Sequence, residues 1–513
     1  MDRTNPIIKA DFPDPDVIRV EDTYYMLSTT MHFRPGAVLL RSYDLVHWEI
    51  VSHVFESLNN SPEECLQGER CAYGHGMWAG SLRYHKESFY VCFASLDASE
   101  TYIYVAKQAD GPWEKKVIPE YRHHPSLLFD EDERVYLVSG YEEIQIRELL
   151  QDCSSYKPGG LHRTLLEPMK EDVYLGYEGS HMQKINGKYY LFVIYWPKVE
   201  PARRTQLFFM ADSLEEDFAG GELLRDDRDY HNQGVAQGGL VETLNGKWYA
   251  ILHQDHGAVG RIPVLVPVRW EGDVPVLGAG GKTPKALDIV SSRPYYQYAP
   301  IYTSDNFRVN ENGEAVLKKQ WEFNHVPDAK NWWFAKEGGL VLRNGKISTN
   351  VVHASNTLTQ RMMWPGCAAE VTVDAAGLRD GDIAGLCALQ GCYGLLGVTK
   401  EHGTYYLVVM ERAWENISRL DRSPDYMPGS LVEKIRLEDS KVRIRLNVNF
   451  EDMEDVAEFY YQNKKRWKRV GEPHTLVFRL DHFTGCRFGL FNFATKEIGG
   501  EAIFKEFRYI YEN

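Results

Sequence analysis

The chain has 513 residues, of which 43% are hydrophobic and 13% aromatic, and its formal net charge is −15 at pH 7. This composition is typical of a globular protein with large cores, and the length allows two or three domains. The negative charge argues against nucleic acid or an anionic membrane as a partner, and no apolar run reaches the length of about 18 residues that a membrane span requires.

The N-terminal residues and the cysteines bear on location. The opening segment has no basic stretch followed by an apolar one, so the chain as given shows no secretory signal. We therefore expect a cytoplasmic protein, unless a signal has been removed. The eight cysteines are scattered and form no Cys-x-x-Cys pair, which argues against zinc ribbons and favours free thiols over disulfides.

A short unit recurs five times in residues 1 to 295. Each copy starts with a polar or large residue, continues as a short strand, and leads into an aromatic strand. The clearest copy starts at Glu178 and turns at Asn186-Gly187, a strong hairpin signal because both turn residues require positive φ. The copies are spaced by about 45 to 65 residues and begin at Asp14, Trp78, His124, Glu178 and Gln237.

A repeat of this kind predicts a five-bladed β-propeller. Each copy would form a small antiparallel sheet around a central axis, and the five leading residues would point towards one end of that axis. The alternative is a β-sandwich with coincidental hairpins, which the recurrence of leading residues in register disfavours.

The second half of the chain has a different pattern. Lys282 to Tyr302 shows no period and is interpreted as a linker. From 304 to 513 strand patterns continue, including Thr475 to Leu480, but the leading-residue unit stops, which predicts a β-sandwich. Ser213 to Phe218 and Ala413 to Leu420 are at most short helical turns. We therefore expect an all-β protein with a propeller at 1–295 and a sandwich at 304–513.

Asp14 and Glu178 are the candidate catalytic pair. Asp14 lies between two prolines, which restrict its backbone, and Glu178 precedes Gly179. Inverting glycoside hydrolysis needs an acid and a base, roughly 6.5–9.5 Å apart, on opposite faces of the sugar. From spacing alone, two surface turn residues are an equally good interpretation.

Several motifs carry a family resemblance. Phe12-Pro13-Asp14-Pro15-Asp16, Ser42 to Trp48, Trp78-Ala79, Pro125-Ser126-Leu127 and Glu178-Gly179-Ser180-His181 occur in an order that resembles glycoside hydrolase family 43. The resemblance covers residues 5 to 280 and implies a five-bladed propeller. The remainder, notably Trp321 to His325 and Leu358 to Arg361, resembles the β-sandwich appended to xylosidase and arabinofuranosidase members.

The resemblance implies roles for three residues. Asp14 takes the place of the general base and Glu178 that of the general acid, whose pKa must be raised. His124 replaces the aspartate that normally tunes this acid. A neutral His124 could orient Glu178, whereas a protonated one would lower its pKa. Three alternatives follow. The enzyme is active with altered pH dependence, it is weak or inactive, or His124 is itself a substitution in the given sequence.

The resemblance also implies ligand contacts. Trp78 and Arg261 match sugar-contacting positions, Phe33 and Gln237 could also reach the pocket, and His253 matches a ligand of a structural calcium or similar ion. The alternatives are blade core for Trp78, a surface salt bridge for Arg261 and a hydrogen-bonded core residue for His253. No P-loop or dinucleotide motif is present, so no organic cofactor is expected.

The resemblance implies an inverting exo-glycosidase that releases a terminal pentose from hemicellulose-derived arabinoxylan or oligosaccharides. The runs Ala10 to Asp16 and Gln254 to Arg261 favour α-L-arabinofuranosidases over β-xylosidases. The sandwich is expected to pack against the propeller, where it could close one side of the pocket. The alternative, motivated by His124, is a non-catalytic carbohydrate-binding propeller. The sequence does not fix the oligomeric state.

Overall fold

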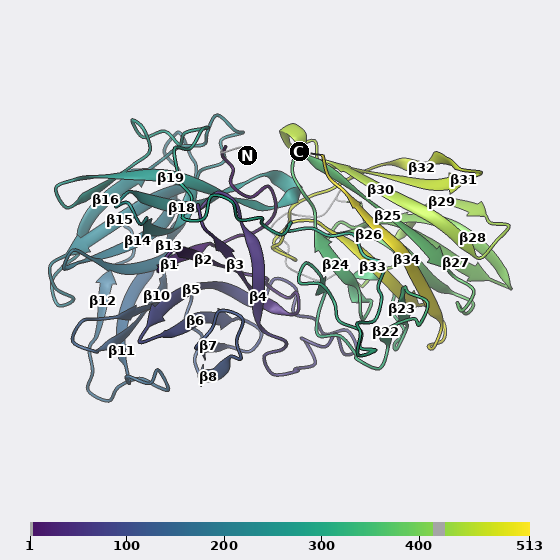
Figure 1. Cartoon of the computed structure of the whole chain (residues 1–513), viewed down its shortest axis with the longest axis horizontal. Coiled ribbons are helices and arrows are strands. Elements are labelled where there is room, and N and C mark those ends of the chain that lie inside the picture. The colour runs from purple at the N-terminus through teal and green to yellow at the C-terminus, as the bar shows by residue number, and fades with distance from the viewer. Residues whose placement is uncertain (1–3, 414–425, 513) are drawn as a thin grey trace.

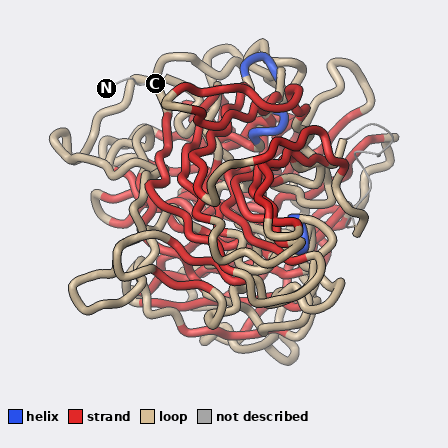
Figure 2. Tube along the Cα trace, turned by 90° about the vertical axis from the view of Figure 1, so that its right-hand side faces the viewer, coloured by secondary structure: helices blue, strands red, loops and turns tan. Residues whose placement is uncertain are grey.

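The computed structural model describes residues 4–413 and 426–512, and it confirms the all-β prediction. A five-bladed propeller and a two-sheet sandwich lie side by side (Figure 1). Strands dominate the described residues (Figure 2), which hold three short 3-10 helices: η1 (Gly257–Val259), η2 (Val351–His353) and η3 (Glu451–Met453). Most of the predicted turn Ala413 to Leu420 lies outside the described residues.

Each blade is a four-stranded antiparallel meander of consecutive strands. Blades one and two are β1 (Asp16–Val20), β2 (Thr23–Ser28), β3 (Gly36–Ser42), β4 (Glu49–Phe55), β5 (Met77–His85), β6 (Ser88–Ser95), β7 (Glu100–Ala106) and β8 (Glu114–Ile118). Blade three is β9 (Ser126–Phe129), β10 (Val135–Tyr141), β11 (Glu143–Leu149) and β12 (His162–Leu166). Blades four and five are β13 (Val173–Ile185), β14 (Lys188–Pro197), β15 (Thr205–Ala211), β16 (Ala219–Leu224), β17 (Ala236–Glu242), β18 (Trp248–Asp255), β19 (Arg261–Glu271) and β20 (Val274–Leu277).

The ring closes through its inner strands. The first strand of each blade contacts the first strand of the next, and β17 contacts β1. Asn5 joins the two ends of the propeller, because its side chain exchanges hydrogen bonds of 2.8 and 2.9 Å with the backbone of Leu265 in blade five. Asn5 therefore has a structural role at the closure.

Residues 292–299 lie against blade one, ahead of the sandwich. The backbone N–H of Ser292 donates to the Tyr43 carbonyl at 2.8 Å, and Arg293 pairs with Asp22 at 2.8 Å. The segment predicted to be a linker is thus held against the propeller.

The sandwich has two seven-stranded antiparallel sheets. In spatial order, the first sheet is β21 (Glu322–Phe323), β24 (Leu358–Arg361), β33 (Arg487–Ala494), β26 (Asp382–Leu389), β27 (Gly394–Glu401), β28 (Thr404–Glu411) and β29 (Ser430–Arg436). The second is β22 (Trp332–Phe334), β23 (Leu340–Arg343), β34 (Glu501–Ile510), β25 (Gly366–Asp374), β30 (Lys441–Asn449), β31 (Val456–Asn463) and β32 (Arg466–Thr475). The prediction of a strand at Thr475 to Leu480 is wrong, since β32 ends at Thr475 and the following turn contacts the propeller through Phe483 and Gly485.

One hydrophobic core continues across the two domains. It joins Phe12 and Val259 of the propeller to Phe488 and Leu490 of the sandwich. Asp11 links the same surfaces, because its carboxylate accepts from the backbone N–H groups of Arg261 and Gly485, each at 2.8 Å. The domains therefore form one packed unit.

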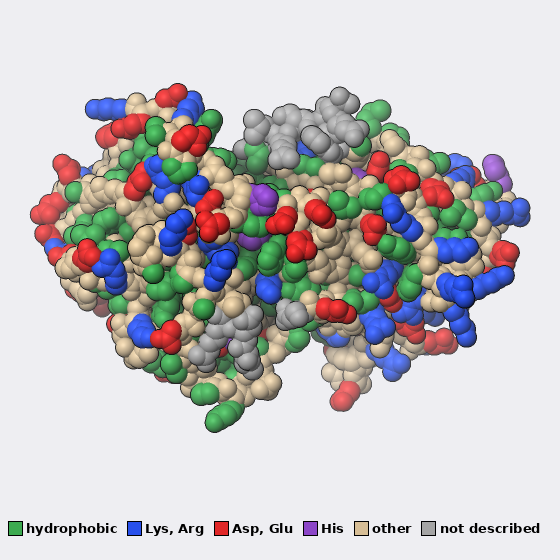
Figure 3. All heavy atoms as spheres, turned by 90° about the horizontal axis from the view of Figure 1, so that it is seen from above, with side chains coloured by type: hydrophobic (Ala, Val, Ile, Leu, Met, Phe, Trp, Pro, Cys, Tyr) green, Lys and Arg blue, Asp and Glu red, His purple; other side chains and the backbone are tan. Residues whose placement is uncertain are grey.

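Three further observations describe the chain as a whole. All eight cysteines are free thiols, as predicted. Among the described residues, no helix combines the length and apolar character needed to cross a membrane. On the face shown in Figure 3, acidic and basic side chains are interspersed over both domains.

A buried ion cluster at the domain junction yields a stability prediction. Glu322 is fully buried and pairs with Arg361 at 2.7 Å, with Arg487, and with His53 of the propeller at 3.0 Å. We expect Glu322→Gln to destabilise the protein by about 3–5 kcal/mol, because removing one partner leaves buried charges unpaired. Denaturant unfolding would measure this loss, with the exposed Glu337→Gln as control.

The same cluster predicts a pH dependence. Burial raises the pKa of Glu322, but the two arginines outweigh burial and hold it well below its ordinary value. A carboxyl whose pKa is lowered on folding stabilises the folded state at pH values above its pKa in the unfolded chain. This stabilisation is lost as the pH falls through the pKa of the folded state. The difference between wild type and Glu322→Gln should therefore shrink in acid, and equal unfolding midpoints at neutral pH would contradict the prediction.

Candidate active site

The residues that lead the blades meet at one end of the propeller, and β-bulges aim several of them. The pairing register shifts between Met77 and Gly80 in β5, on both sides of Glu178 in β13, and between Ala236 and Gly239 in β17. Bulges re-aim side chains and are common beside active sites. Glu178 was expected at the entrance of its strand, but it lies inside β13. The strand begins earlier because the residues before Glu178, from Val173 on, also pair with β14.

Three leading residues have left-handed backbones. Asp14, His124 and Gln237 have φ values of 53°, 44° and 68°. Such conformations cost about 1–3 kcal/mol each in a side-chain-bearing residue and persist only where the surroundings enforce them. Their clustering in this one region marks it as a candidate functional site.

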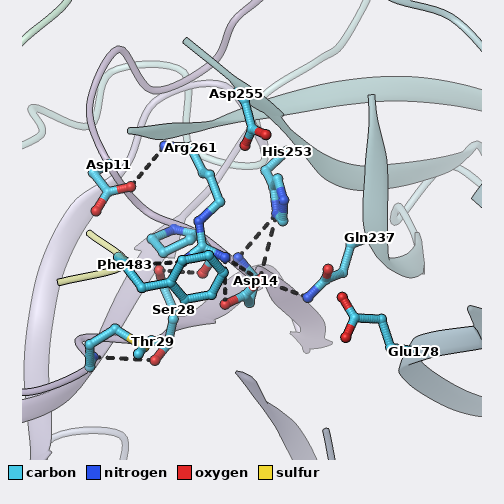
Figure 4. Close-up of polar contacts among 12 residues, drawn as sticks. Asp11, Asp14, Ser28, Thr29, Glu178, Gln237, His253, Asp255, Arg261 and Phe483 are labelled. Carbon is cyan, nitrogen blue, oxygen red and sulfur yellow. Dashed lines mark hydrogen bonds and ion pairs between the residues drawn. The ribbon is translucent and has the colours of Figure 1, made fainter. Parts of the chain in front are cut away.

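Asp14 and Glu178 approach the same point from different blades (Figure 4). The Nε2 of Gln237 donates to Oδ1 of Asp14 at 2.7 Å. Gly179, beside Glu178, packs against the same glutamine, and an added Cβ there would lie 3.0 Å from the Gln237 Cγ. Gln237 therefore lies between the two carboxylates.

Asp14 is held rigidly in a buried position. Nη1 of Arg261 donates to both carboxylate oxygens at 3.0 and 3.2 Å, and the Asp14 backbone N–H donates to Nδ1 of His253 at 3.2 Å. Burial raises the pKa of Asp14, Arg261 opposes this rise, and the charge of Glu178 adds to it. Arg261 is thus a partner of Asp14 rather than a surface salt bridge.

His253 does not fit the expected metal-ligand role. A donor faces each of its ring nitrogens: the Asp14 backbone N–H lies 3.2 Å from Nδ1, which leaves Nε2 as the nitrogen that would bind an ion. That Nε2 faces Nη1 of Arg204 at 3.2 Å, and Arg204 also pairs with Asp255 at 2.9 Å. A guanidinium therefore occupies the place that a cation would take, and the residues present do not fit an ion there.

Glu178 is paired with a histidine that the motif comparison did not single out. Nε2 of His123 lies 3.1 Å from Oε2 of Glu178, and Nδ1 of His123 lies 2.8 Å from the Tyr121 hydroxyl. His124 stacks on His123 with ring centroids 4.3 Å apart. Two imidazoles therefore border the carboxyl where one aspartate was expected.

The electrostatics at Glu178 run against a resting general acid. Burial raises the pKa of Glu178, but the hydrogen bond with His123 and the charges of His124, His123 and Arg204 outweigh it and lower it to about 2. Burial, with the charge of His123, lowers the pKa of His124 to about 3, so His124 is neutral at pH 7. We attribute the low pKa of Glu178 to its hydrogen bond with His123 and to the charge of Arg204, because the neutral His124 ring contributes no charge.

The sandwich contributes an aromatic wall to the site. Phe483 lies 5.4 Å from Trp78, centroid to centroid, and its ring is 4.5 Å from the Arg261 guanidinium carbon. Its backbone carbonyl accepts from Nη2 of Arg261 at 3.3 Å. Trp78 also borders both histidines, with centroids 5.5 and 6.2 Å away. The aromatic rings therefore flank the carboxylates.

One predicted contact is misplaced, and several residues were missed. Phe33 is 1% exposed and packs in the interdomain core, where Arg487 lies 3.4 Å from its ring, so it does not line the site. His123, Arg204 and Phe483 were not predicted. Of these three, only His123 has a signal in the sequence, namely its position beside His124. Arg204 and Phe483 reach the site from distant segments and have no such signal.

Comparison with known proteins identifies the families of both domains. Residues 3–275 match the family model described as glycosyl hydrolases family 43, and residues 305–510 match a beta xylosidase C-terminal concanavalin A-like domain. A beta-xylosidase of Formosa agariphila is 27% identical over 99% of this chain and 90% of its own length. A non-reducing end alpha-L-arabinofuranosidase of Bacteroides ovatus is 23% identical over 82% and 78%.

Solved structures extend the similarity to the whole chain. A structure described as a bifunctional GH43-CE protein of Bacteroides eggerthii has a TM-score of 0.91 at 38% identity and covers all of this chain. The present chain spans 64% of that protein. An engineered GH43 glycoside hydrolase, described as having endo-xylanase and exo-arabinofuranosidase activity, has a TM-score of 0.87 at 26% identity over 99% of both chains.

Proposed function

Because the chain belongs to glycosyl hydrolases family 43, we propose that it is an inverting exo-glycosidase that removes a terminal pentose from xylan-type chains. The observation that supports this proposal is the convergence of Asp14 and Glu178 from blades one and four, with Gln237 between them. Two carboxyl groups on facing elements are what single-displacement glycoside hydrolysis requires.

In this proposal Asp14 is the general base. Its carboxylate removes a proton from the attacking water, while Arg261 and Gln237 hold it in orientation. Glu178 donates its proton to the leaving oxygen as the glycosidic bond breaks, so the configuration of the anomeric carbon inverts. Trp78 and Phe483 provide rings against which the apolar side of a sugar can stack.

The aromatic wall favours action at a chain end. Because Phe483 comes from the sandwich and contacts Trp78 and Arg261, it narrows one side of the site. A narrowed site accepts a terminal residue more readily than the interior of a polysaccharide. The relatives named above include a beta-xylosidase and an arabinofuranosidase, so β-D-xylopyranose and α-L-arabinofuranose are the two candidate sugars.

Product analysis tests this function. The enzyme would be incubated with 4-nitrophenyl β-D-xylopyranoside, 4-nitrophenyl α-L-arabinofuranoside and arabinoxylan oligosaccharides. Proton NMR during the first turnovers should show a single pentose released with inverted anomeric configuration. Retention of configuration, or internal cleavage of the chain, would refute the mechanism, and the ratio of kcat/KM values would assign the sugar.

A second candidate is a carbohydrate-binding propeller with little or no catalysis. The specific observation in its favour is the low pKa of Glu178, about 2, which leaves this group ionised at neutral pH. An ionised carboxyl cannot donate a proton to a leaving group. Retained sugar binding without turnover of any pentoside across the pH range would establish this alternative.

His124 yields a prediction on pH dependence. We expect His124→Asp to raise the pKa of Glu178 by about one to three units, because a second carboxylate disfavours ionisation of the first. A general acid must be protonated, so activity declines as the pH rises through its pKa. The declining limb of the kcat/KM profile should therefore move to higher pH, and activity at pH 6 should rise.

The control for this prediction is an exposed histidine. His402 has a side chain 94% exposed and lies in the sandwich, so His402→Gln should leave the pH profile unchanged. A His124→Asp profile that superimposes on that of the wild type would show that His124 does not influence the proton donor.

A further inference from the structure

The replacement of one carboxylate by two imidazoles creates a cluster of metal-ligand type. One potential ligand atom from each of His123, His124 and Glu178 lies within 4.8 Å of the others. The closest pair, His123 Nε2 and Glu178 Oε2, is 3.1 Å apart. Ligand atoms of one tetrahedral zinc lie about 3.3 Å apart, given bonds of about 2.0 Å, which is close to the spacing of this pair.

His124 supplies an independent indication of a ligand. It is 6% exposed, and its Nδ1 has no hydrogen-bond partner among the described residues. Buried polar nitrogens are normally satisfied, so an unsatisfied one requires an explanation.

His123 has the partner that metal-binding histidines need. If its Nε2 ligates, its proton must move to Nδ1, and the Tyr121 hydroxyl 2.8 Å from Nδ1 can accept the resulting hydrogen bond. Such a second partner fixes the tautomer and orients the ring.

The charge of the surroundings also suits a dication. The described site holds four carboxylates and two guanidinium groups: Asp11, Asp14, Glu178 and Asp255, with Arg204 and Arg261. These six groups sum to two negative charges. A divalent cation would offset this excess.

From these observations we propose that His123, His124 and Glu178 bind a borderline transition-metal dication, with Zn²⁺ as the type case and Co²⁺, Ni²⁺ and Cu²⁺ as related ligands. Two nitrogen ligands and one carboxylate select such ions over Ca²⁺ and Mg²⁺, which prefer oxygen. Occupancy would engage the Glu178 carboxylate. In the proposed function, on which this inference rests, Glu178 is the proton donor. A metal bound to its carboxylate would therefore inhibit hydrolysis reversibly.

Direct binding tests the site without reference to activity. Chelator-treated protein would be titrated with Zn²⁺ by calorimetry and with Co²⁺ by visible absorption. We expect one equivalent per chain, with affinity at least about tenfold weaker in His123→Gln and in His124→Asn. Gln at 123 retains a donor towards Glu178, which separates loss of a ligand from loss of local structure, and His402→Gln should bind as the wild type does.

Activity measurements then test the consequence. Zn²⁺ should inhibit pentoside hydrolysis with the same midpoint as binding, and chelator should restore activity. Equal affinity in wild type and both histidine variants, or no binding at all, would overturn the proposal, as would Zn²⁺-saturated enzyme of full activity. If the metal-free protein hydrolyses no pentoside but binding still depends on both histidines, the metal site stands and the hydrolase proposal fails.

Discussion

Replacing Glu178 by Gln is expected to lower kcat/KM on xylan-derived oligosaccharides by about 10²–10⁴-fold, the usual contribution of a general acid. Gln occupies nearly the same volume and can still contact His123, so the fold should be retained. The leaving oxygen of a sugar is strongly basic and requires protonation as the bond breaks. Initial rates on reduced oligosaccharides would measure the loss.

The leaving group distinguishes this role from a structural one. The dinitrophenolate released from a dinitrophenyl pentoside departs without a proton. Glu178→Gln should therefore lose far less activity on this substrate than on oligosaccharides. The exposed Glu171→Gln, in the segment before β13, is the matched control and should behave as wild type. An equal loss on both substrate classes would remove Glu178 from the acid role.

For Asp14→Asn we expect a loss of about 10²–10⁴-fold on all substrates alike, because activation of water does not depend on the leaving group. Asn is the appropriate replacement, since Asp14 has a φ of 53° and Asn tolerates this left-handed conformation. The amide also retains an oxygen that can accept from Gln237 and Arg261.

Steady-state kinetics with both leaving groups, together with an unfolding midpoint, would test this prediction. The exposed Asp110→Asn serves as control. Wild-type turnover by Asp14→Asn would contradict the role of base, and a normal rate on the dinitrophenyl substrate alone would transfer Asp14 to the acid step.

The fold was predictable because it is repetitive. Five hairpin units with leading residues in register indicate blades, and the loss of that unit near residue 300 indicates a second domain. The positions of Asp14 and Glu178 followed from the same register. The bulge that carries Glu178 inside β13 did not, because a bulge depends on pairing with β14 and leaves no local pattern.

The rest of the site depends on contacts between distant segments. Arg204 reaches His253 from the start of blade four's third strand, and Phe483 reaches Arg261 from the other domain. Phe33 shows the opposite error. It was predicted to reach the sugar pocket, but its ring is covered by the Arg487 guanidinium. Pattern reasoning assigns residues to elements, whereas these contacts are set by how the domains pack.

The wall formed by Phe483 has a consequence for how such enzymes diversify. The turn that carries it lies far along the chain from either carboxylate, and it is irregular backbone between β32 and β33 rather than part of a sheet. Insertions or exchanges in that turn would reshape the side of the site that Phe483 narrows, while the two carboxylates stay unchanged. Libraries aimed at new oligosaccharide preferences should therefore vary the C-terminal module first.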